Sequence, residues 1–281
     1  MKRNQHLLII DPQNDFCDLP PSYCPINPAT GQPHAPALPV PGAHADMQRL
    51  AALIRQGQRG LDAISVTLDS HHRFDIAHPT FWYAPGGKAV SPFTEIAAAD
   101  VRAGRFTPRD PSALPRALAY LDALEATGRY RLMVWPVHCE IGSWGHNVHE
   151  DVRAAYNAWE DASLGVVTKI GKGSNPWTEH YSAVMAEVPD DADPGTQLNR
   201  KLIASLAQAS RVYIAGEAGS HCVKATTEHI AGHVDPSKLV LVTDCMSPVA
   251  GFDQQYRSFL EAMRARGAQA MTSAQVLEEL R

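Results

Sequence analysis

Two kinds of apolar pattern alternate along this chain, and together they predict its secondary structure. Short continuous apolar runs, typical of buried strands, lie at residues 7–10, 63–68, 131–135, 164–168, 211–215 and 239–243. Segments with apolar residues every three or four positions predict helices at about 45–56, 112–126, 148–158, 196–209, 223–232, 253–266 and 273–280. Buried strands separated by amphipathic helices form parallel sheets covered on both faces. We therefore predict an α/β protein, a three-layer αβα sandwich with a mostly parallel, Rossmann-like sheet.

The length of the chain fits one large α/β domain with a full core, because 281 residues bury most of their apolar surface. No stretch between the apolar runs has the composition of a flexible linker, so we predict a single domain over residues 1–281. Two segments read as insertions. Residues 18–40 hold seven prolines, and residues from about 97 to 130 are rich in alanine. Both are candidates for a lid or a subunit contact.

Composition excludes some classes of partner. The net charge is −5 and there is no block of Lys and Arg, which argues against nucleic acid and anionic membranes. No apolar run approaches 18 residues, and the first residues lead directly into a predicted strand rather than into the apolar core of a secretion signal. The five cysteines include no C-x-x-C pair, which fits reduced thiols. We expect a cytoplasmic protein.

Three residues with catalytic chemistry follow predicted strands. Cys222 lies between the apolar run at 211–215 and a predicted helix, whose N-terminus would stabilise a thiolate. Asp11 ends the run at 7–10, and Lys172 follows the run at 164–168. Because ligands of open α/β sheets bind beyond the carboxyl ends of the strands, these residues predict covalent catalysis in one crevice. The alternative for an isolated cysteine is a small buried apolar residue.

A second group of residues has the chemistry of a metal site. Asp69 and His71 follow the apolar run at 63–68, and residues two apart on a strand point to the same side. A carboxylate and an imidazole placed in this way are suitable ligands for a divalent ion. The alternative for these two residues alone is a solvated loop.

These motifs, taken together and in order, resemble those of the isochorismatase-like cysteine hydrolases, and within that family the nicotinamidases. The matching segments are Asp11-Pro-Gln-Asn-Asp-Phe16, Asp69-Ser-His71, Trp135-Pro-Val-His138-Cys139, Lys172-Gly173, Tyr181-Ser-Ala183, Gly216-Glu-Ala218 and His221-Cys-Val223. The resemblance extends from residue 7 to about residue 250.

The resemblance implies a catalytic triad. In it Asp11 takes the thiol proton, Cys222 attacks an amide carbonyl, and Lys172, favoured over Lys169, orients the pair and lowers the pKa of the thiol. It also implies that the backbone N–H groups of Ala218 and Cys222 form an oxyanion hole, and that the bond between Glu217 and Ala218 is cis. Glu217 departs from the apolar residue that is usual there, and we expect it to put a carboxylate close to the nucleophile.

The resemblance further implies a metal and an aromatic pocket. His138 would be the third metal ligand beside Asp69 and His71, and zinc is the first choice of ion, with iron and manganese as alternatives. His78 is either an additional ligand or a loop histidine. Three aromatic residues would line the substrate pocket, and three residues of an altered loop are candidates for reshaping it. The pocket residues are Phe16, Trp135 and Tyr181; the loop residues are Glu140, Trp144 and His146.

The function that follows is a metal-containing cysteine amidohydrolase, nicotinamidase-like, which converts a small heteroaromatic primary amide into the acid and ammonia through a thioester. One alternative is a related hydrolase acting on another small amide or carbamoyl compound. An alternative of a different class is a binding or redox protein without catalysis. We expect a small-molecule amide as the partner and a homo-oligomer as the assembly.

Overall fold

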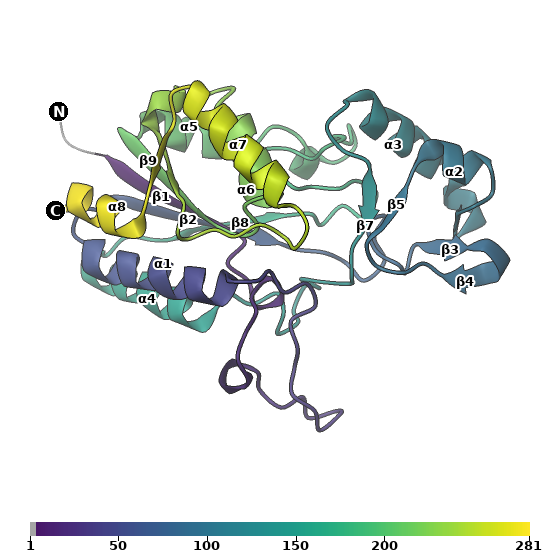
Figure 1. The fold of residues 1–281 in the computed structure, drawn as a ribbon, viewed down its shortest axis with the longest axis horizontal. Helices are drawn as coiled ribbons and strands as arrows, with labels where there is room; N and C mark the ends of the chain where they lie inside the picture. Colours follow the sequence, from purple (N-terminus) through teal and green to yellow (C-terminus); the bar gives the residue numbers. More distant parts are fainter. Residues whose placement is uncertain (1–3) are drawn as a thin grey trace.

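A sheet of six parallel strands forms the centre of the molecule, in the order β11-β10-β9-β1-β2-β8 (Figure 1). The computed structural model describes residues 4–281. Residues 1–3 lie outside this range; they begin the segment in which the sequence predicts no secretion signal. The strands are β1 (Gln5–Ile10), β2 (Ala63–Asp69), β8 (Thr168–Lys172), β9 (Arg211–Gly216), β10 (Leu239–Val242) and β11 (Gln269–Met271). The predicted parallel α/β sheet is confirmed.

Helices cover both faces of this sheet, which confirms the three-layer sandwich (Figure 1). One layer contains α1 (Ala43–Gly57), α4 (Glu150–Ser163) and α8 (Ser273–Leu280), of which α4 and α8 both pack against α1. The other layer contains α5 (Arg200–Gln208), α6 (Cys222–Ile230) and α7 (Asp253–Ala265). No helix in residues 4–281 combines the length and the apolar character that crossing a membrane requires.

The connections that follow the neighbouring strands β1 and β9 run to opposite faces of the sheet, an arrangement that leaves a crevice at the carboxyl ends of the two strands. After β1 the chain continues into α1 on one face, whereas after β9 it continues into α6 on the other face (Figure 1). The two strands are paired in register, with Ile10 opposite Gly216. Gly216 has φ of 115°, and a Cβ there would lie 1.9 Å from the Ile10 carbonyl oxygen, so only glycine fits. Segments that follow β1 and β9 therefore begin side by side.

Two predicted strands need correction. The run at 131–135 forms β7 (Leu132–Val134), which pairs antiparallel with β5 (Thr94–Ile96) in a separate two-stranded sheet and not in the central one. The run at 164–168 mostly precedes its strand, because β8 spans Thr168–Lys172, and Leu164 and Val166 are 90% and 81% exposed. An apolar run predicts an extended segment but does not specify its hydrogen-bonding partner.

A smaller lobe lies at one end of the molecule beside β5 and β7 (Figure 1). It includes α2 (Ala98–Arg102), α3 (Leu114–Ala126) and a three-stranded antiparallel sheet of β3 (Trp82–Ala84), β4 (Lys88–Ala89) and β6 (Thr107–Pro108). The alanine-rich segment at 97–130 contributes α2, β6 and α3 to this lobe. Short 3-10 turns occupy Asn14–Phe16, Pro21–Tyr23, Pro85–Gly87, Pro111–Ala113, Pro194–Thr196 and Pro236–Lys238.

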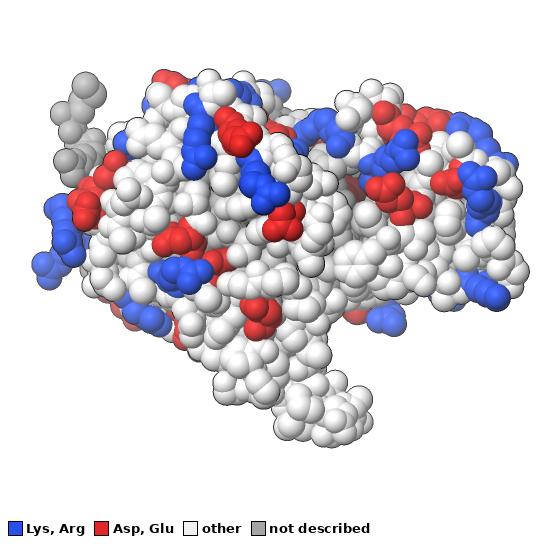
Figure 2. All heavy atoms as spheres, in the orientation of Figure 1, with Lys and Arg blue, Asp and Glu red and all other residues white. Residues whose placement is uncertain are grey.

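The proline-rich segment at residues 18–40, called the arm below, projects away from the sandwich (Figure 1). Figure 2 shows the projecting part without charged atoms, in agreement with a sequence that has no Lys, Arg, Asp or Glu from residue 19 to residue 45. The arm returns to the body near its end, where Leu38 and Val40 donate backbone hydrogen bonds to Asp15 and Phe16 at 3.0 Å each. These bonds bring the end of the arm next to the segment that follows β1.

Candidate active site

Three strands deliver the predicted triad to one point. Asp11 follows β1, Lys172 ends β8 and Cys222 opens α6 after β9. The Lys172 Nζ lies 2.9 Å from Asp11 Oδ2 and 3.6 Å from Cys222 Sγ. All three side chains are buried. A nucleophile, a carboxylate and a cation therefore share one site beyond the carboxyl ends of the strands.

Neighbouring strands hold the acid and the lysine in place. Thr67 of β2 donates its hydroxyl proton to Asp11 Oδ1 and accepts the backbone N–H of Asp11 at 3.0 Å. Asp11 has φ of 42°, an uncommon conformation for a residue with a side chain. The Lys172 ammonium also donates to the His180 carbonyl oxygen at 3.0 Å and to Asp69 Oδ1 at 2.9 Å. This network leaves the ammonium little freedom to move away from the thiol.

Burial and charge set the protonation states of the triad. Burial opposes the charge on Lys172, but Asp11 and Asp69 outweigh it and hold the lysine pKa well above its usual value. Burial raises the pKa of Cys222, Lys172 lowers it, and the two carboxylates add to the rise. Lys172 thus acts in the expected direction, yet the net shift is upward and the resting sulfur is a thiol. Burial also raises the pKa of Asp11 against the pull of Lys172, which suits a residue that must carry a proton.

The segment before Cys222 presents backbone donors to the nucleophile. The bond between Glu217 and Ala218 is cis, as the resemblance implies, and Cys222 is the first residue of α6. The first N–H groups of a helix have no acceptor within it and carry partial positive charge. An oxyanion that forms on a carbonyl attacked by Cys222 could be bound there.

A cluster of imidazoles and one carboxylate lies next to the triad. The Nε2 atoms of His71 and His138 are 3.1 and 3.4 Å from Asp69 Oδ2. The other oxygen of this carboxylate accepts the Lys172 hydrogen bond, so Asp69 connects the cluster to the triad. His78, which the sequence left open, belongs to the cluster: ligand atoms of His71, His78 and His138 lie within 4.8 Å of one another.

The donor set of this cluster fits a divalent ion. Asp75 lies 3.0 Å from His71 Nδ1, and the Pro136 carbonyl lies 2.8 Å from His138 Nδ1, which leaves both Nε2 atoms facing Asp69. Burial lowers the pKa of His78 to about 3, so its ring is neutral and able to bind a metal. For His71 the carboxylates of Asp69 and Asp75 outweigh burial and hold its pKa well above the usual value, so a divalent ion would bind there in place of a proton. Two or three imidazoles and a carboxylate suit zinc, iron or manganese.

A narrow cavity adjoins both groups of residues. Its free volume, about 20 Å³, is close to that of a single water molecule. The lining residues are Phe16, Leu38, Asp69, Trp135, His138, Glu179, Tyr181, Ala218, His221, Cys222 and Val249. All three predicted aromatic residues are in this set, and Trp135 Nε1 donates to the Tyr181 hydroxyl at 3.1 Å. Because the walls are mostly apolar and aromatic, a flat aromatic ligand would suit the cavity once side chains move apart.

Four of the lining residues were not predicted. Leu38 comes from the end of the arm, His221 precedes the nucleophile, and Val249 follows β10. Glu179 is buried, its Oε2 has no hydrogen-bond partner in the described part of the chain, and burial raises its pKa to about 7. Because His221 directly precedes Cys222, the sequence could have indicated that it lies in the cavity. Leu38, Glu179 and Val249 come from segments without a chemical motif.

The altered loop after His138 does not reach this cavity. Glu140 forms an ion pair with Arg73 at 3.6 Å, and His146 Nε2 lies 2.9 Å from Ser70 Oγ. Trp144 stacks on His34 of the arm with ring centroids 5.4 Å apart. None of the three side chains lines the cavity, and only Trp144 contacts the arm, so an effect of this loop on the substrate pocket stays a prediction.

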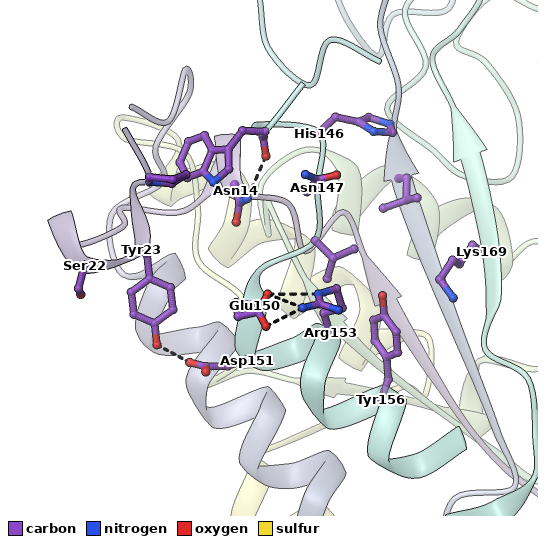
Figure 3. Close-up of a pocket in the computed structure, with 14 residues that line it drawn as sticks. Asn14, Ser22, Tyr23, His146, Asn147, Glu150, Asp151, Arg153, Tyr156 and Lys169 are labelled. Carbon is purple, nitrogen blue, oxygen red and sulfur yellow. Dashed lines mark hydrogen bonds and ion pairs between the residues drawn. The ribbon is translucent and has the colours of Figure 1, made fainter. Parts of the chain in front are cut away.

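Trp144 and His146 line a second, larger hollow, called the groove below, between the arm and α4 (Figure 3). Its volume is about 940 Å³. Lys169 faces the groove, with Nζ 5.0 Å from the centre of the Tyr156 ring (Figure 3). The structure thus brings Lys172, and not Lys169, to Cys222.

Comparison with solved structures gives close agreement in fold at low sequence identity. No protein-family model matches this chain, and no curated protein matches it by sequence. The Acinetobacter baumanii nicotinamidase/pyrazinamidase superposes with a TM-score of 0.62 at 18% identity, covering 98% of this chain and 99% of that one. A pyrazinamidase of Pyrococcus horikoshii in complex with zinc gives 0.52 at 19% identity, over 96% and 99% of the two chains.

An isochorismatase-like hydrolase from Alkaliphilus metalliredigens also superposes, with a TM-score of 0.51 at 14% identity over 99% of this chain and all of its own. The similarity extends over nearly the whole chain in each case, so it includes the central sheet and the segments that carry the site. This chain therefore has the fold that nicotinamidases share with isochorismatase-like hydrolases.

Proposed function

We propose that this protein is a metal-containing cysteine amidohydrolase that hydrolyses a small heteroaromatic primary amide, such as nicotinamide, to the acid and ammonia. The observation that carries the proposal is the meeting of Asp11 and Lys172 with Cys222, which lines an aromatic cavity beside the Asp69 and histidine cluster. Structural neighbours described as nicotinamidases and pyrazinamidases support the same class of reaction.

The first half of the reaction forms a thioester. The Cys222 sulfur attacks the amide carbon while its proton passes to the Asp11 carboxylate, and the carbonyl oxygen becomes an oxyanion that the Ala218 and Cys222 N–H groups bind. When the C=O bond forms again, the C–N bond breaks and Asp11 gives its proton to the departing nitrogen, which leaves as ammonia. Lys172 stays protonated and holds the carboxylate and the sulfur together.

The second half regenerates the enzyme. A water molecule gives a proton to Asp11 and adds to the thioester carbon, and the C–S bond then breaks. Asp11 returns the proton to the Cys222 sulfur, and the acid is released. Because Asp11 is both base and acid in each half, its raised pKa serves the reaction by keeping the proton available for the next transfer.

The metal site in this proposal consists of Asp69, His71 and His138, with His78 as an additional ligand, and zinc is the first choice of ion. A bound divalent ion would supply a Lewis acid that holds the ring nitrogen of the substrate at one end of the cavity. The zinc complex of the Pyrococcus horikoshii pyrazinamidase supports this choice. Homo-oligomer formation and a cytoplasmic location stay predictions.

Ammonia release from nicotinamide, pyrazinamide, benzamide and small aliphatic amides tests the proposal. We expect rapid turnover of the two heteroaromatic amides by protein of known metal content, weak turnover of benzamide, and none with Cys222→Ala. Cys24→Ala, a change in the arm, is the matched control and should retain wild-type rates. Turnover by Cys222→Ala would contradict covalent catalysis, and turnover of aliphatic amides alone would move the substrate to another class of small amide.

A further inference from the structure

The Glu217 side chain turns away from the catalytic cavity. It is not among the residues that line the cavity, although its carbonyl carbon belongs to the cis bond next to Ala218. The carboxyl group is fully buried, and its Oε2 accepts the backbone N–H of Ser247 at 3.2 Å. The expectation that this carboxylate lies close to the nucleophile is therefore wrong. It lies behind the segment that presents the oxyanion donors.

A second buried carboxyl group faces the same serine. The hydroxyl of Ser247 donates to Asp46 Oδ2, and Asp46 Oδ1 pairs with Arg49 one turn further along α1. Arg49 also donates to the Asp244 carbonyl oxygen. The negative charge of Asp46 is thus compensated by a guanidinium. Glu217 Oε1 has no hydrogen-bond partner among the described residues, and the neighbours of its carboxyl group include Ser247 and Asp46.

The segment that contains Ser247 also holds the oxyanion segment by its backbone. Gly216 donates to the Cys245 carbonyl at 2.9 Å, and Gly219 donates to the Ser247 carbonyl at 2.7 Å. The Val249 N–H donates to Ser220 Oγ at 3.0 Å. Residues on both sides of Ala218 are therefore fixed to residues 245–249, and the Glu217 side chain adds a hydrogen bond between the same two segments.

We propose that Glu217 is a positioning residue, which in its protonated form joins the oxyanion segment to Ser247 and Asp46 and so keeps the Ala218 N–H in place for catalysis. This inference rests on the proposed amidohydrolase function. A neutral carboxyl group is required because a second buried charge beside Asp46 would be left without a counter-ion. Loss of its proton would push the two carboxylates apart and displace the oxyanion segment.

The surroundings of Glu217 favour the neutral form. Burial raises its pKa well above the usual value, Asp46 and the more distant Asp18 raise it further, and the Ser247 N–H opposes them. The other titratable groups facing it are Cys17, whose pKa burial raises well above its usual value, and Tyr256 of α7, whose pKa burial also raises. Both stay uncharged near neutral pH, and since neither can become a cation, they offer no counter-ion to a Glu217 carboxylate.

Activity measured against pH tests the positioning role. We expect Glu217→Leu to lower kcat by about tenfold to a hundredfold with KM within about threefold, since a displaced oxyanion donor affects the transition state more than the bound substrate. Glu217→Gln, which keeps a neutral hydrogen-bonding side chain, should recover most of the lost kcat and show a weaker decline at alkaline pH than the wild type. Glu261→Gln, an exposed change on α7, is the matched control and should behave as the wild type.

Unfolding measured against pH tests the protonation state without any substrate. A glutamic acid with a raised pKa binds its proton more tightly in the folded chain, so the folded state is stabilised below the unfolded pKa of about 4.3 and loses that stabilisation as pH rises. The urea midpoint of the wild type should therefore fall relative to that of Glu217→Gln between about pH 5 and pH 9. If the difference between the two urea midpoints does not change with pH, the proposal that Glu217 is protonated in the folded protein is overturned.

The two measurements separate the possible failures. Equal kcat for Glu217→Leu and Glu217→Gln would overturn the positioning role even if the amidase activity is present. If the wild type releases no ammonia from any amide while the urea midpoints diverge as expected, the proposed function fails and the protonated Glu217 stands. If Glu217→Leu does not fold, Asp46→Asn is measured in its place. The urea midpoint of Asp46→Asn should depend less on pH than that of the wild type. An unchanged pH dependence in Asp46→Asn would overturn the pairing.

Discussion

The catalytic cavity and the groove differ in how their polar groups are paired. The groove is by far the larger, and several of its polar groups are paired within the chain: Arg153 pairs with Glu150 at 2.7 Å, and the Tyr23 hydroxyl donates to Asp151 at 2.7 Å (Figure 3). In the small cavity, Glu179 Oε2 has no hydrogen-bond partner among residues 4–281, and beside the cavity ligand atoms of His71, His78 and His138 lie within 4.8 Å of one another.

The comparison shows that volume is a poor guide to chemistry in this protein. Burial of unpaired polar groups has a cost of about 1–3 kcal/mol each, and such groups persist where a ligand or a reaction uses them. In the groove, the Arg153–Glu150 pair, the Tyr23–Asp151 hydrogen bond and the placement of Lys169 over the Tyr156 ring are contacts within the chain that packing alone explains. Three predictions contrast the two regions, beginning with the largest expected effect.

The two lysines on β8 should behave in opposite ways. Lys172→Ala removes the cation between Asp11 and Cys222, so we expect kcat for the amide to fall by at least about 10³-fold. Lys169→Ala changes only the groove and should leave kcat within about twofold. Steady-state ammonia release, with circular dichroism to confirm folding, measures both. More than a tenth of wild-type kcat in Lys172→Ala would contradict the triad.

Two neighbouring histidines that follow β2 should differ in their effect on metal binding, because one is buried and the other is exposed. His71→Ala removes a buried ligand beside Asp69, so we expect metal content per chain to fall severalfold and the activity on nicotinamide to fall with it. His72→Ala, an exposed change at the next residue, should retain both. Elemental analysis after dialysis measures the metal. Full metal content in His71→Ala would show that the ligand set is wrong.

The smallest effect should come from the edge of the groove. His149 caps α4 and lies 2.9 Å from His44, and burial lowers its pKa to about 4. A histidine with a depressed pKa stabilises the fold at pH values above its unfolded pKa of about 6.5. This stabilisation, on the order of 3 kcal/mol at most, is lost as the pH falls toward 4. His149→Asn, which keeps a capping oxygen, should flatten the urea-derived stability between about pH 7 and pH 4.5. An identical acid decline in His149→Asn would refute this assignment, and catalysis should change little.

Local patterns were sufficient for most of the central sheet. The run Leu7–Ile10 is buried along its whole length, and its four apolar residues predicted a strand covered on both faces. The same reasoning misplaced β7, because its three residues pair with β5 across a loop that no periodicity describes. It also missed β3, β4, β5, β6 and β11, each only two or three residues long and therefore too short to show a period.

For the site, the sequence could name residues that chemistry makes conspicuous. Asp11, Lys172 and Cys222 each follow or end a strand, and the structure brings them within hydrogen-bonding or ion-pair distance. It could not identify Glu179, whose significance lies in an unpaired oxygen inside a buried wall. Nor could it tell that Trp144 belongs to the groove, since that depends on the path of the arm.

The sequence by itself thus determined the αβα architecture and which side chains carry nucleophilic, acidic and metal-binding chemistry, since hydrophobic period and side-chain type are local properties. Only the tertiary structure decided which of these groups lie together, why His78 joins the cluster of His71 and His138, and where the Glu217 carboxyl group points. Those outcomes depend on burial and on contacts between segments far apart in the chain, such as Glu217 with Ser247 and Asp46. Desolvation and pairing, which set the protonation states, exist only once those segments have packed together.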